Sequence, residues 1–514
     1  MWKTLLSSSI LVSCILETIA APPQAVLDVF SPRLNGRLHG RFLHISDMHP
    51  DPHYKSGASQ SSACHRKKPK KEQRSGYYGT PFSECDSPFT LTNFTLDFLD
   101  EHWSDEIDFV ICLHDNDDEI PRTLDEIYDL NRAVAKRMEE VFLNKGIPVV
   151  PSLGNNDISR PNDIIDEFSL IWDRFIPPAS HTIFRQGAYY SVEVIPNAIA
   201  VISVNTMYFF NSNKGHVPPS SDTYFSECHY RYTELSLRFQ DIILGHLFGH
   251  MNADHFFFIE AGDLVIPSHE ESASIDSASN TNLFENLITD FAQLPTPFKD
   301  LSYDDYAVVN VNPSVVPNPY LPSFRVFAYN VTEISSLIQK GDADKEGIKI
   351  AAQRKSNYHH GNPGNEASEC STGPYRDSWR CRLGEPWHSD SEAPSRRNTL
   401  WSPLGYAQYY LPKLDEFDER HEPEFELEYL TFPITSLHGG DEGTAAMPPI
   451  PLRNLPKGLL KTGVTESKFA PYEMKDLTIP SWIDLAQRLG KKGEKKLRKR
   501  FRRYMYMGGE AGEE

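Results

Sequence analysis

Two features that define common protein classes are missing from this sequence: long apolar runs and an excess of basic residues. Beyond the N-terminus no stretch contains 18 uninterrupted apolar residues, which excludes a protein with several membrane-spanning helices. Lys and Arg number 51 against 71 Asp and Glu, and the net charge of −20 argues against a general nucleic-acid-binding protein. A polyanionic partner must therefore be held by local basic patches or by metal ions, against the overall electrostatic field.

The chain does contain enough apolar material for a large core. Its 514 residues are 39% apolar and 11% aromatic, which excludes wholesale disorder and suggests one large catalytic domain with appendages or two to three domains. The 38 prolines and 29 glycines indicate long irregular segments rather than a helical bundle or a repeat protein.

Residues 1–20 have the pattern of a secretory signal. Lys3 precedes an apolar run over residues 10–16, and small residues follow up to Ala20. Two outcomes stay open: cleavage near Ala20 or Ala21, or retention as a short signal anchor that associates the protein with a membrane. Either outcome predicts entry into the secretory pathway.

Cysteines and sequons agree with an oxidising compartment. After Cys14 six cysteines remain, and four of them form two pairs that are close in sequence, as expected for disulfides that close local loops. We therefore predict one disulfide between Cys64 and Cys85 and another between Cys370 and Cys381. Two Asn-X-Thr sequons predict glycosylation at Asn93 and Asn330.

Short apolar runs alternate with helical patterns over residues 41–260, which predicts an α/β domain with sites where the strands end. The expected strands are 42–46, 109–113, 149–153, 199–204 and 242–248, and the clearest expected helix is 124–143.

The second half of the chain has two compositions. Residues 261–400 are rich in Ser, Pro and Asn, and we interpret them as an irregular insertion and linker, partly disordered. Residues 401–514 regain aromatic and β-branched residues, so strands packing on the core are expected there. A basic terminal helix is predicted at 482–506.

Metal-ligand residue types follow several of the expected strands. Asp47 and His49 come directly after strand 42–46, and Asn155 follows strand 149–153 through a glycine. His216 and His250 each follow a glycine, and His250 comes after strand 242–248. A single histidine is more often structural than a ligand, but signals of this kind in this order indicate a metal site.

These motifs resemble those of the calcineurin-like metallophosphoesterases, and within them the fungal vacuolar endopolyphosphatases, which are related to the acid sphingomyelinases. The most specific matches are residues 46–51, 85–88, 153–158 and 249–256. The resemblance implies a four-layer α/β/β/α sandwich, cleavage of internal phosphoanhydride bonds of inorganic polyphosphate, and a location in the vacuole or on the lumenal face of its membrane.

The resemblance also implies a site with two divalent metal ions, for which Mn, Mg, Co, Zn or Fe are candidates. Asp47 and His49 would bind the first ion, and Asn155, His216 and His250 the second. Asn252 stands where relatives usually have another metal-binding histidine. His114 matches a candidate proton donor to the leaving group.

Two departures from the family pattern concern this chain. The motif after strand 109–113 should be Gly-Asp, with the Asp bridging both metals, but the strand runs directly into His114. Asp115 or Asp117 would have to be the substitute, and Asp115 is the nearer. Only nine residues separate Thr206 from His216, where the family has a helix and a further strand, and a parallel crossover needs about a dozen residues or more. Both departures look like missing segments.

Two basic stretches are candidate polyanion-binding elements. The first lies between Cys64 and Cys85 and comprises Arg66, Lys67, Lys68, Lys70, Lys71 and Arg74. The second, over residues 491–503, could hold polyphosphate, contact anionic lipid, be a processing region or simply be a solvated helix face.

The sequence supports three hypotheses for the function of this protein. The leading one is hydrolysis inside inorganic polyphosphate, with no nucleic-acid partner. The second is a phosphodiesterase of the sphingomyelinase type, although no saposin-like cysteine pattern precedes the domain. The third is a catalytically impaired polyphosphate-binding protein, which the missing Gly-Asp would favour.

Overall fold

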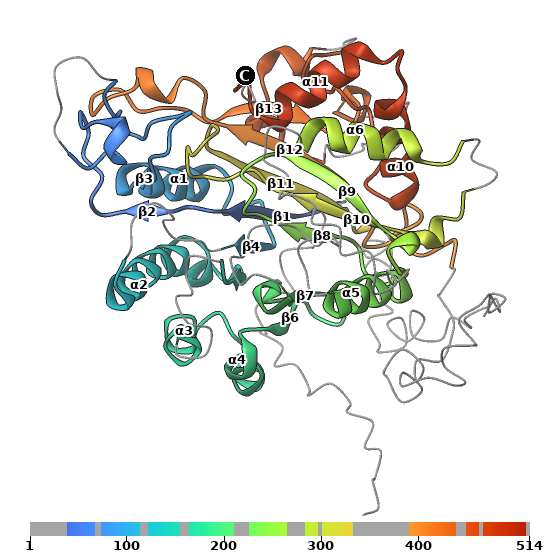
Figure 1. Ribbon diagram of the computed structural model, residues 1–514, viewed down its shortest axis with the longest axis horizontal. Helices are drawn as coiled ribbons and strands as arrows, with labels where there is room; N and C mark the ends of the chain where they lie inside the picture. The colour runs from blue at the N-terminus through green and yellow to red at the C-terminus, as the bar shows by residue number, and fades with distance from the viewer. Residues whose placement is uncertain are drawn as a thin grey trace, which may run out of the picture.

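The computed structural model describes residues 39–66, 73–113, 122–154, 164–209, 226–264, 283–296, 301–332, 390–437, 449–461 and 466–509. Within these ranges the strands lie between two groups of helices, as Figure 1 shows. The molecule is thus a mixed α/β protein, as the alternation in the sequence predicts.

The larger sheet has six strands in the order β13-β12-β11-β1-β4-β5 and is part parallel, part antiparallel. Its parallel part is β1 (His39–Ser46), β4 (Phe109–Leu113) and β5 (Val149–Ser152). Its antiparallel part is β11 (Ser323–Asn330), β12 (Pro403–Tyr410) and β13 (Glu426–Leu430). No residue of β1 or β4 is exposed, and burial does not alternate along β1, so neighbours pack on both faces of the sheet there.

The second sheet has three strands in the order β8-β10-β9: β8 (His246–Phe248), β10 (Tyr306–Val311) and β9 (His255–Glu260). Two smaller pairings are β2 (Pro50–Asp51) with β3 (Ser87–Pro88), and β6 (Tyr190–Ile195) with β7 (Ile199–Ser203). The strand expected at 242–248 is therefore extended only from His246 onward.

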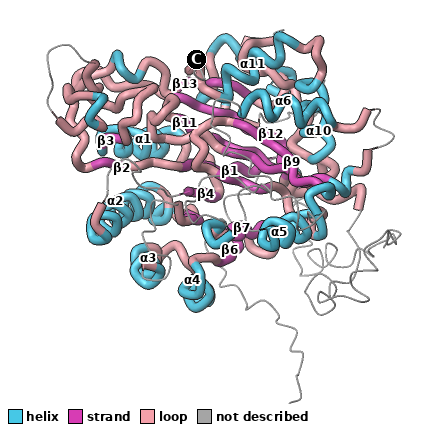
Figure 2. The backbone as a smooth tube through the Cα atoms, viewed as in Figure 1, coloured by secondary structure: helices cyan, strands magenta, loops and turns pink. Residues whose placement is uncertain are grey.

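Helices cover both sides of the strands (Figure 2). On one side lie α2 (Leu124–Val141), α3 (Ile165–Ile171), α4 (His181–Gly187) and α5 (Ser226–Arg238), with α1 (Phe89–His102) packed against α2. On the other lie α6 (Leu283–Gln293), α10 (Ile479–Gly490) and α11 (Lys495–Met505). Helix α2 begins where expected, because the Thr123 side chain caps it by accepting from the Glu126 N–H.

Two expectations were wrong. Residues 283–330, inside the stretch expected to be irregular, form α6, β10 and β11, and the two strands are interior members of their sheets. Their apolar runs are short and flanked by Pro and Asn, so periodicity alone does not distinguish them from loop. The basic helix expected at 482–506 is two helices, because the chain turns between Gly490 and Lys495, and Arg498 donates to the last carbonyls of α10.

None of the described helices combines the length and the apolar character that crossing a bilayer requires. The signal expected at residues 1–20 lies outside the described residues.

Of the two expected disulfides, the structure contains the one between Cys64 and Cys85. Cys370 and Cys381 both lie outside the described residues. A disulfide between Cys370 and Cys381 therefore stays a prediction from their spacing in the sequence.

Candidate active site

The ends of the three parallel strands lie at one edge of the larger sheet. Ser46 pairs with Leu113, and Leu113 pairs with Ser152, so residues that follow β1, β4 and β5 all leave the sheet at the same level. The Asp47 N–H donates to the Leu113 carbonyl at 3.0 Å, which joins the first two of these ends. The sheet therefore brings together the starts of three of the sequence motifs.

A loop of the second sheet meets this edge at Asp47. The buried Asp47 carboxylate accepts the backbone N–H of His250, with 2.9 Å between Oδ2 and N. The neighbouring Gly249 allows the approach, because a Cβ atom there would lie 2.5 Å from Asp47 Oδ2. Asp47 and His250, which are 203 residues apart in the chain, are thus in direct contact, as a shared site requires.

Four expected ligand residues have left-handed backbone conformations. The φ angles are 49° at Asp47, 41° at His49, 71° at His250 and 55° at Asn252. Non-glycine residues rarely adopt this region, and such strain gathers at functional sites where the surrounding structure holds it in place. Four of the 13 non-glycine residues with positive φ in the described part are thus expected ligands.

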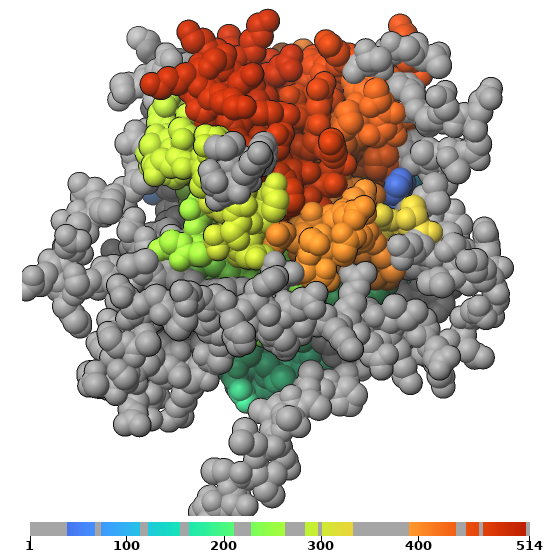
Figure 3. Space-filling model, turned by 90° about the vertical axis from the view of Figure 1, so that its right-hand side faces the viewer, coloured from blue at the N-terminus to red at the C-terminus, as the bar shows by residue number. Residues whose placement is uncertain are grey.

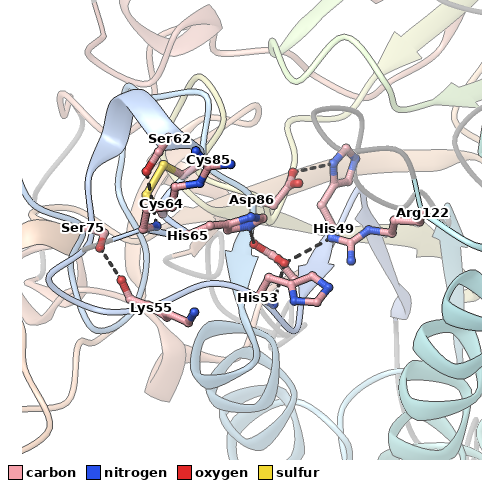
Figure 4. A network of polar contacts seen from close by, with 12 residues as sticks. His49, His53, Lys55, Ser62, Cys64, His65, Ser75, Cys85, Asp86 and Arg122 are labelled. Carbon is pink, nitrogen blue, oxygen red and sulfur yellow. Dashed lines mark hydrogen bonds and ion pairs between the residues drawn. A yellow bond between two sulfur atoms is a disulfide. The ribbon is translucent and has the colours of Figure 1, made fainter. Parts of the chain in front are cut away.

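His49 lies beside a carboxylate that sequence reasoning had not assigned. Its Nδ1 is 3.2 Å from Asp86 Oδ1, and both side chains are buried. Figure 4 shows this pair next to the Cys64–Cys85 disulfide. Metal-binding histidines usually have their second ring nitrogen on a carboxylate, so this donor set fits a metal ligand. The only signal in the sequence was the position of Asp86 directly after Cys85 in a matched motif.

A further loop, residues 312–318 after β10, was also missed. The backbone N–H groups of Val315 and Val316 donate to the carbonyls of Ser46 and Asp47 at 3.0 and 2.8 Å. Asn252 Nδ2 donates to the Asn318 carbonyl at 2.7 Å. This loop therefore holds the end of β1 and the 249–252 loop together. It lies in the stretch expected to be irregular, so the sequence carried no sign of it.

The 249–252 loop is anchored beyond its end by a buried ion pair. The Asp254 carboxylate accepts from Arg325 on β11 and from the Tyr429 hydroxyl on β13. Arg325 also donates to Gln408 at 2.7 Å and to the Val311 carbonyl at 3.1 Å. The pair fastens the second sheet to the first, two residues from Asn252. Removing one partner of such a buried pair typically costs about 3–5 kcal/mol.

The remaining expected ligands, Asp115, Asn155 and His216, lie outside the described residues, and so does the expected proton donor His114. Among the residues that are described, no group of three or more His, Cys, Asp or Glu side chains could hold a metal ion. The structure thus brings together Asp47, His250 and Asn252, and places His49 two residues after Asp47 with Asp86 beside it.

The first basic stretch is described only at its two ends. Arg66 and Arg74 are exposed, and neither forms an ion pair with a described residue, while Lys67, Lys68, Lys70 and Lys71 lie outside the described part. The predicted Cys64–Cys85 disulfide closes this loop. Asp51 anchors it further through His65 at 2.5 Å and Arg122 at 3.2 Å, which ties it to the start of α2.

The two sequons differ in their surroundings. Asn93 is exposed on α1. Asn330 ends β11, where its side chain accepts from Thr332 and donates to Asn398.

A cavity of about 1040 Å³ opens beside Asp47 and His250. Most of its wall is apolar and comes from β4, β7, α5 and β8. Residues 210–225, between β7 and α5, are outside the described ranges, and the shortened link before His216 falls there.

Two buried histidines, His44 and His255, and the partly buried His246 have lowered pKa values. Burial, and then Arg325, lowers the pKa of His44 to about 3, and neither of its ring nitrogens has a hydrogen-bond partner among the described residues. Burial lowers the pKa of His246 and of His255 to about 4.

The chain is similar in sequence to several fungal proteins named endopolyphosphatase, although no protein-family model matches it. The protein of Cryptococcus neoformans is 34% identical and matches 92% of each chain. Those of Schizosaccharomyces pombe and Saccharomyces cerevisiae are 28% and 30% identical and match 88% and 58% of this chain, or 83% and 62% of their own lengths. The Cryptococcus alignment spans 634 positions against 514 residues here, so that relative has residues that this chain lacks. With this identity over nearly its whole length, the chain belongs to the fungal endopolyphosphatase family.

Proposed function

We propose that this protein hydrolyses phosphoanhydride bonds inside inorganic polyphosphate and so shortens long chains. The proposal is supported most strongly by the contact of Asp47 with the His250 loop at the strand ends, in a chain whose relatives are named for this activity. The names of these relatives do not favour the sphingomyelinase-type alternative.

The proposed metal ligands are Asp47 and His49 for one divalent ion and Asn155, His216, His250 and Asn252 for the other, with Asp115 as substitute for the bridging carboxylate. When bound, the two ions would polarise a phosphoryl oxygen, activate water and neutralise charge on the leaving oxygen. The oxygen and nitrogen donor atoms of these Asp, His and Asn side chains suit a divalent metal ion. The Asp86 carboxylate beside His49 also supports this assignment. The fold is proposed to be the four-layer sandwich, with the two sheets as its inner layers.

The chain's own residues are proposed to do three things. Asp47 holds the His250 loop against the strand ends through the backbone contact. His114, directly after β4, donates a proton to the departing phosphate. Arg66 and Arg74, with the lysines between them, hold a polyphosphate chain on either side of the bond that is cut.

We also propose a vacuolar location reached through the secretory pathway, with glycans at Asn93 and Asn330, a second disulfide between Cys370 and Cys381, and residues 1–20 as signal or anchor. The Cys64–Cys85 disulfide supports an oxidising compartment.

The test is the pattern of products from long polyphosphate with divalent metal present. Internal cutting produces intermediate lengths early and little orthophosphate on a gel. Replacing Arg66, Lys67, Lys68, Lys70, Lys71 and Arg74 by Gln should weaken binding of long chains and flatten its salt dependence, because each phosphate contact releases counterions. Stepwise release of orthophosphate alone would show an enzyme that acts at chain ends and would contradict the proposal.

A further inference from the structure

Helix α11 carries a dense set of exposed basic side chains, which we call the basic strip: Lys495, Lys496, Lys499, Arg500, Arg502 and Arg503. None of them forms an ion pair within 4 Å with any described residue. By contrast, Arg132 and Arg137 on α2 each contact two carboxylates. In a protein of net charge −20, the strip is a local concentration of positive charge.

Helix stability does not explain the strip. Cations near the last turn are favourable to the helix dipole, which accounts for Arg502 and Arg503. Lys495 and Lys496 lie in the first turn, where a positive charge opposes the dipole, and the N-cap residue Glu494 is the acidic residue next to them, because the first turn itself contains none. These lysines lower the stability of the helix, so their presence suggests an external anion.

The spacing forms two rows along the helix. Lys495, Lys499 and Arg502 lie at positions i, i+4 and i+7, and Lys496, Arg500 and Arg503 repeat that spacing one residue later. At 1.5 Å per residue the strip is about 12 Å long, which suits an extended polyanion lying along the helix. The opposite face is buried through Leu497, Phe501, Tyr504 and Met505, so the rows are held rigidly.

The strip adjoins the candidate site through the C-terminal end of α11. The Met505 carbonyl accepts the N–H of Asp254 at 2.9 Å, and Asp254 is two residues beyond Asn252. Figure 3 shows the C-terminal segment, in red, at the molecular surface. The C-terminal end of α11 is therefore held by the backbone of the segment that follows the 249–252 loop.

We propose that the basic strip is a second binding surface for polyphosphate, which holds a distant part of the chain whose internal bond is in the active site. This proposal rests on the proposed function and adds a preference for long chains, because a second contact on one chain raises its effective concentration at the first. A bilayer is the less suitable partner, since the apolar face that would insert into it is buried in the protein.

The test compares two full-length variants. The strip variant carries Lys495→Gln, Lys496→Gln, Lys499→Gln and Arg500→Gln, and the matched control carries Arg420→Gln, Lys457→Gln, Lys461→Gln and Lys475→Gln. All eight side chains are exposed, and each variant removes three Lys and one Arg. Binding of long polyphosphate is measured with a metal chelator present. Hydrolysis of long chains and of inorganic triphosphate is measured with metal.

In the strip variant we expect affinity for long chains to fall about tenfold near 0.1 M salt, and the slope of log affinity against log salt to fall by about 3, at roughly 0.7 per contact. The KM for long chains should rise in parallel, while triphosphate hydrolysis stays unchanged because so short a chain cannot reach both surfaces. The control variant should match wild type.

Equal long-chain affinity in the two variants would overturn the proposal. If the strip variant loses binding to anionic phospholipid vesicles but still binds long polyphosphate like wild type, the strip is a membrane-binding surface. That outcome would also overturn the proposal. A wild type that binds long chains through the strip but hydrolyses none would contradict the proposed function and leave the strip standing.

Discussion

At the scale of single residues, Asp86 is the group that most directly controls a proposed ligand. It lies 37 positions from His49 in the chain and 3.2 Å from its Nδ1 in space. A carboxylate in this place fixes the imidazole tautomer and orientation and raises the basicity of the other nitrogen. The disulfide at Cys85 and the pairing of β2 with β3 hold Asp86 where it can act.

Replacing Asp86 by Asn should weaken divalent metal binding about 10–100-fold, because the charge that orients His49 is lost while the shape is kept. Metal affinity is measured by titration calorimetry, independently of activity, and the fold by circular dichroism. Asp415→Asn, at an exposed carboxylate, is the control and should bind metal as wild type does. The Asp47→Asn variant should bind no divalent metal at one of the two proposed metal sites. Equal affinity in Asp86→Asn and Asp415→Asn would show that Asp86 does not position the ligand.

At the level of helices and strands, β7 and β8 border a cavity and carry or adjoin exposed apolar side chains. Strand β8 is an edge strand, and the large apolar side chains of Ile202 and Ile242 are 69% and 74% exposed nearby. The cavity of about 1040 Å³ is lined by the same elements. Edge strands and exposed apolar side chains are features that additional chain segments often cover in folded proteins.

We expect that inserting the relative's residues between Thr206 and His216, together with a Gly-Asp segment after Leu113, raises polyphosphate hydrolysis roughly a hundredfold. A ligand displaced by about 1 Å can cost that factor, and a bridging carboxylate offsets the repulsion between two neighbouring dications. Rates are compared at saturating divalent metal.

The control for this graft is a Gly/Ser linker of the same length at each point, which should not raise the rate. Equal activity of the native and grafted chains would mean that Asp115 or Asp117 already bridges the metals and that the short link is tolerated.

At the scale of the whole molecule, buried titratable groups link stability to pH. His44, His246 and His255 have pKa values lowered to about 3, 4 and 4 by burial, whereas in the unfolded chain a histidine binds a proton below about pH 6.5. Between these limits the unfolded state binds more protons, so acidification favours unfolding. Glu428 acts in the opposite direction, because burial raises its pKa well above the usual value.

The free energy of unfolding should therefore fall as pH is lowered from about 6.5 to about 4. Replacing His44 by Met removes one of the three contributions and should reduce the slope by about 1.4 kcal/mol per pH unit. Denaturant unfolding at several pH values measures this. His421→Met, at an exposed histidine, is the control and should keep the wild-type slope. An unchanged slope in His44→Met would show that His44 does not stay neutral in the folded protein.

Residue patterns along the chain were enough to predict the positions of β1, β4, β5, β7 and α2, each within a few residues of its observed range. It also predicted the disulfide between Cys64 and Cys85, which the structure confirms. These features depend on apolar runs, capping residues and short loops, which are properties of neighbouring residues in the chain.

Three features could be seen only in the folded structure. Strands β10 and β11 lie inside their sheets, and Asp86 faces His49. Residues 312–318 hold the motif loops together. The ion pair of Arg325 with Asp254, which joins the two sheets beside Asn252, was also seen only there. Each of these contacts joins positions that are dozens to hundreds of residues apart. Their energies come from burial and hydrogen bonding between segments whose own residue patterns do not name a partner, so they exist only once the whole chain has packed.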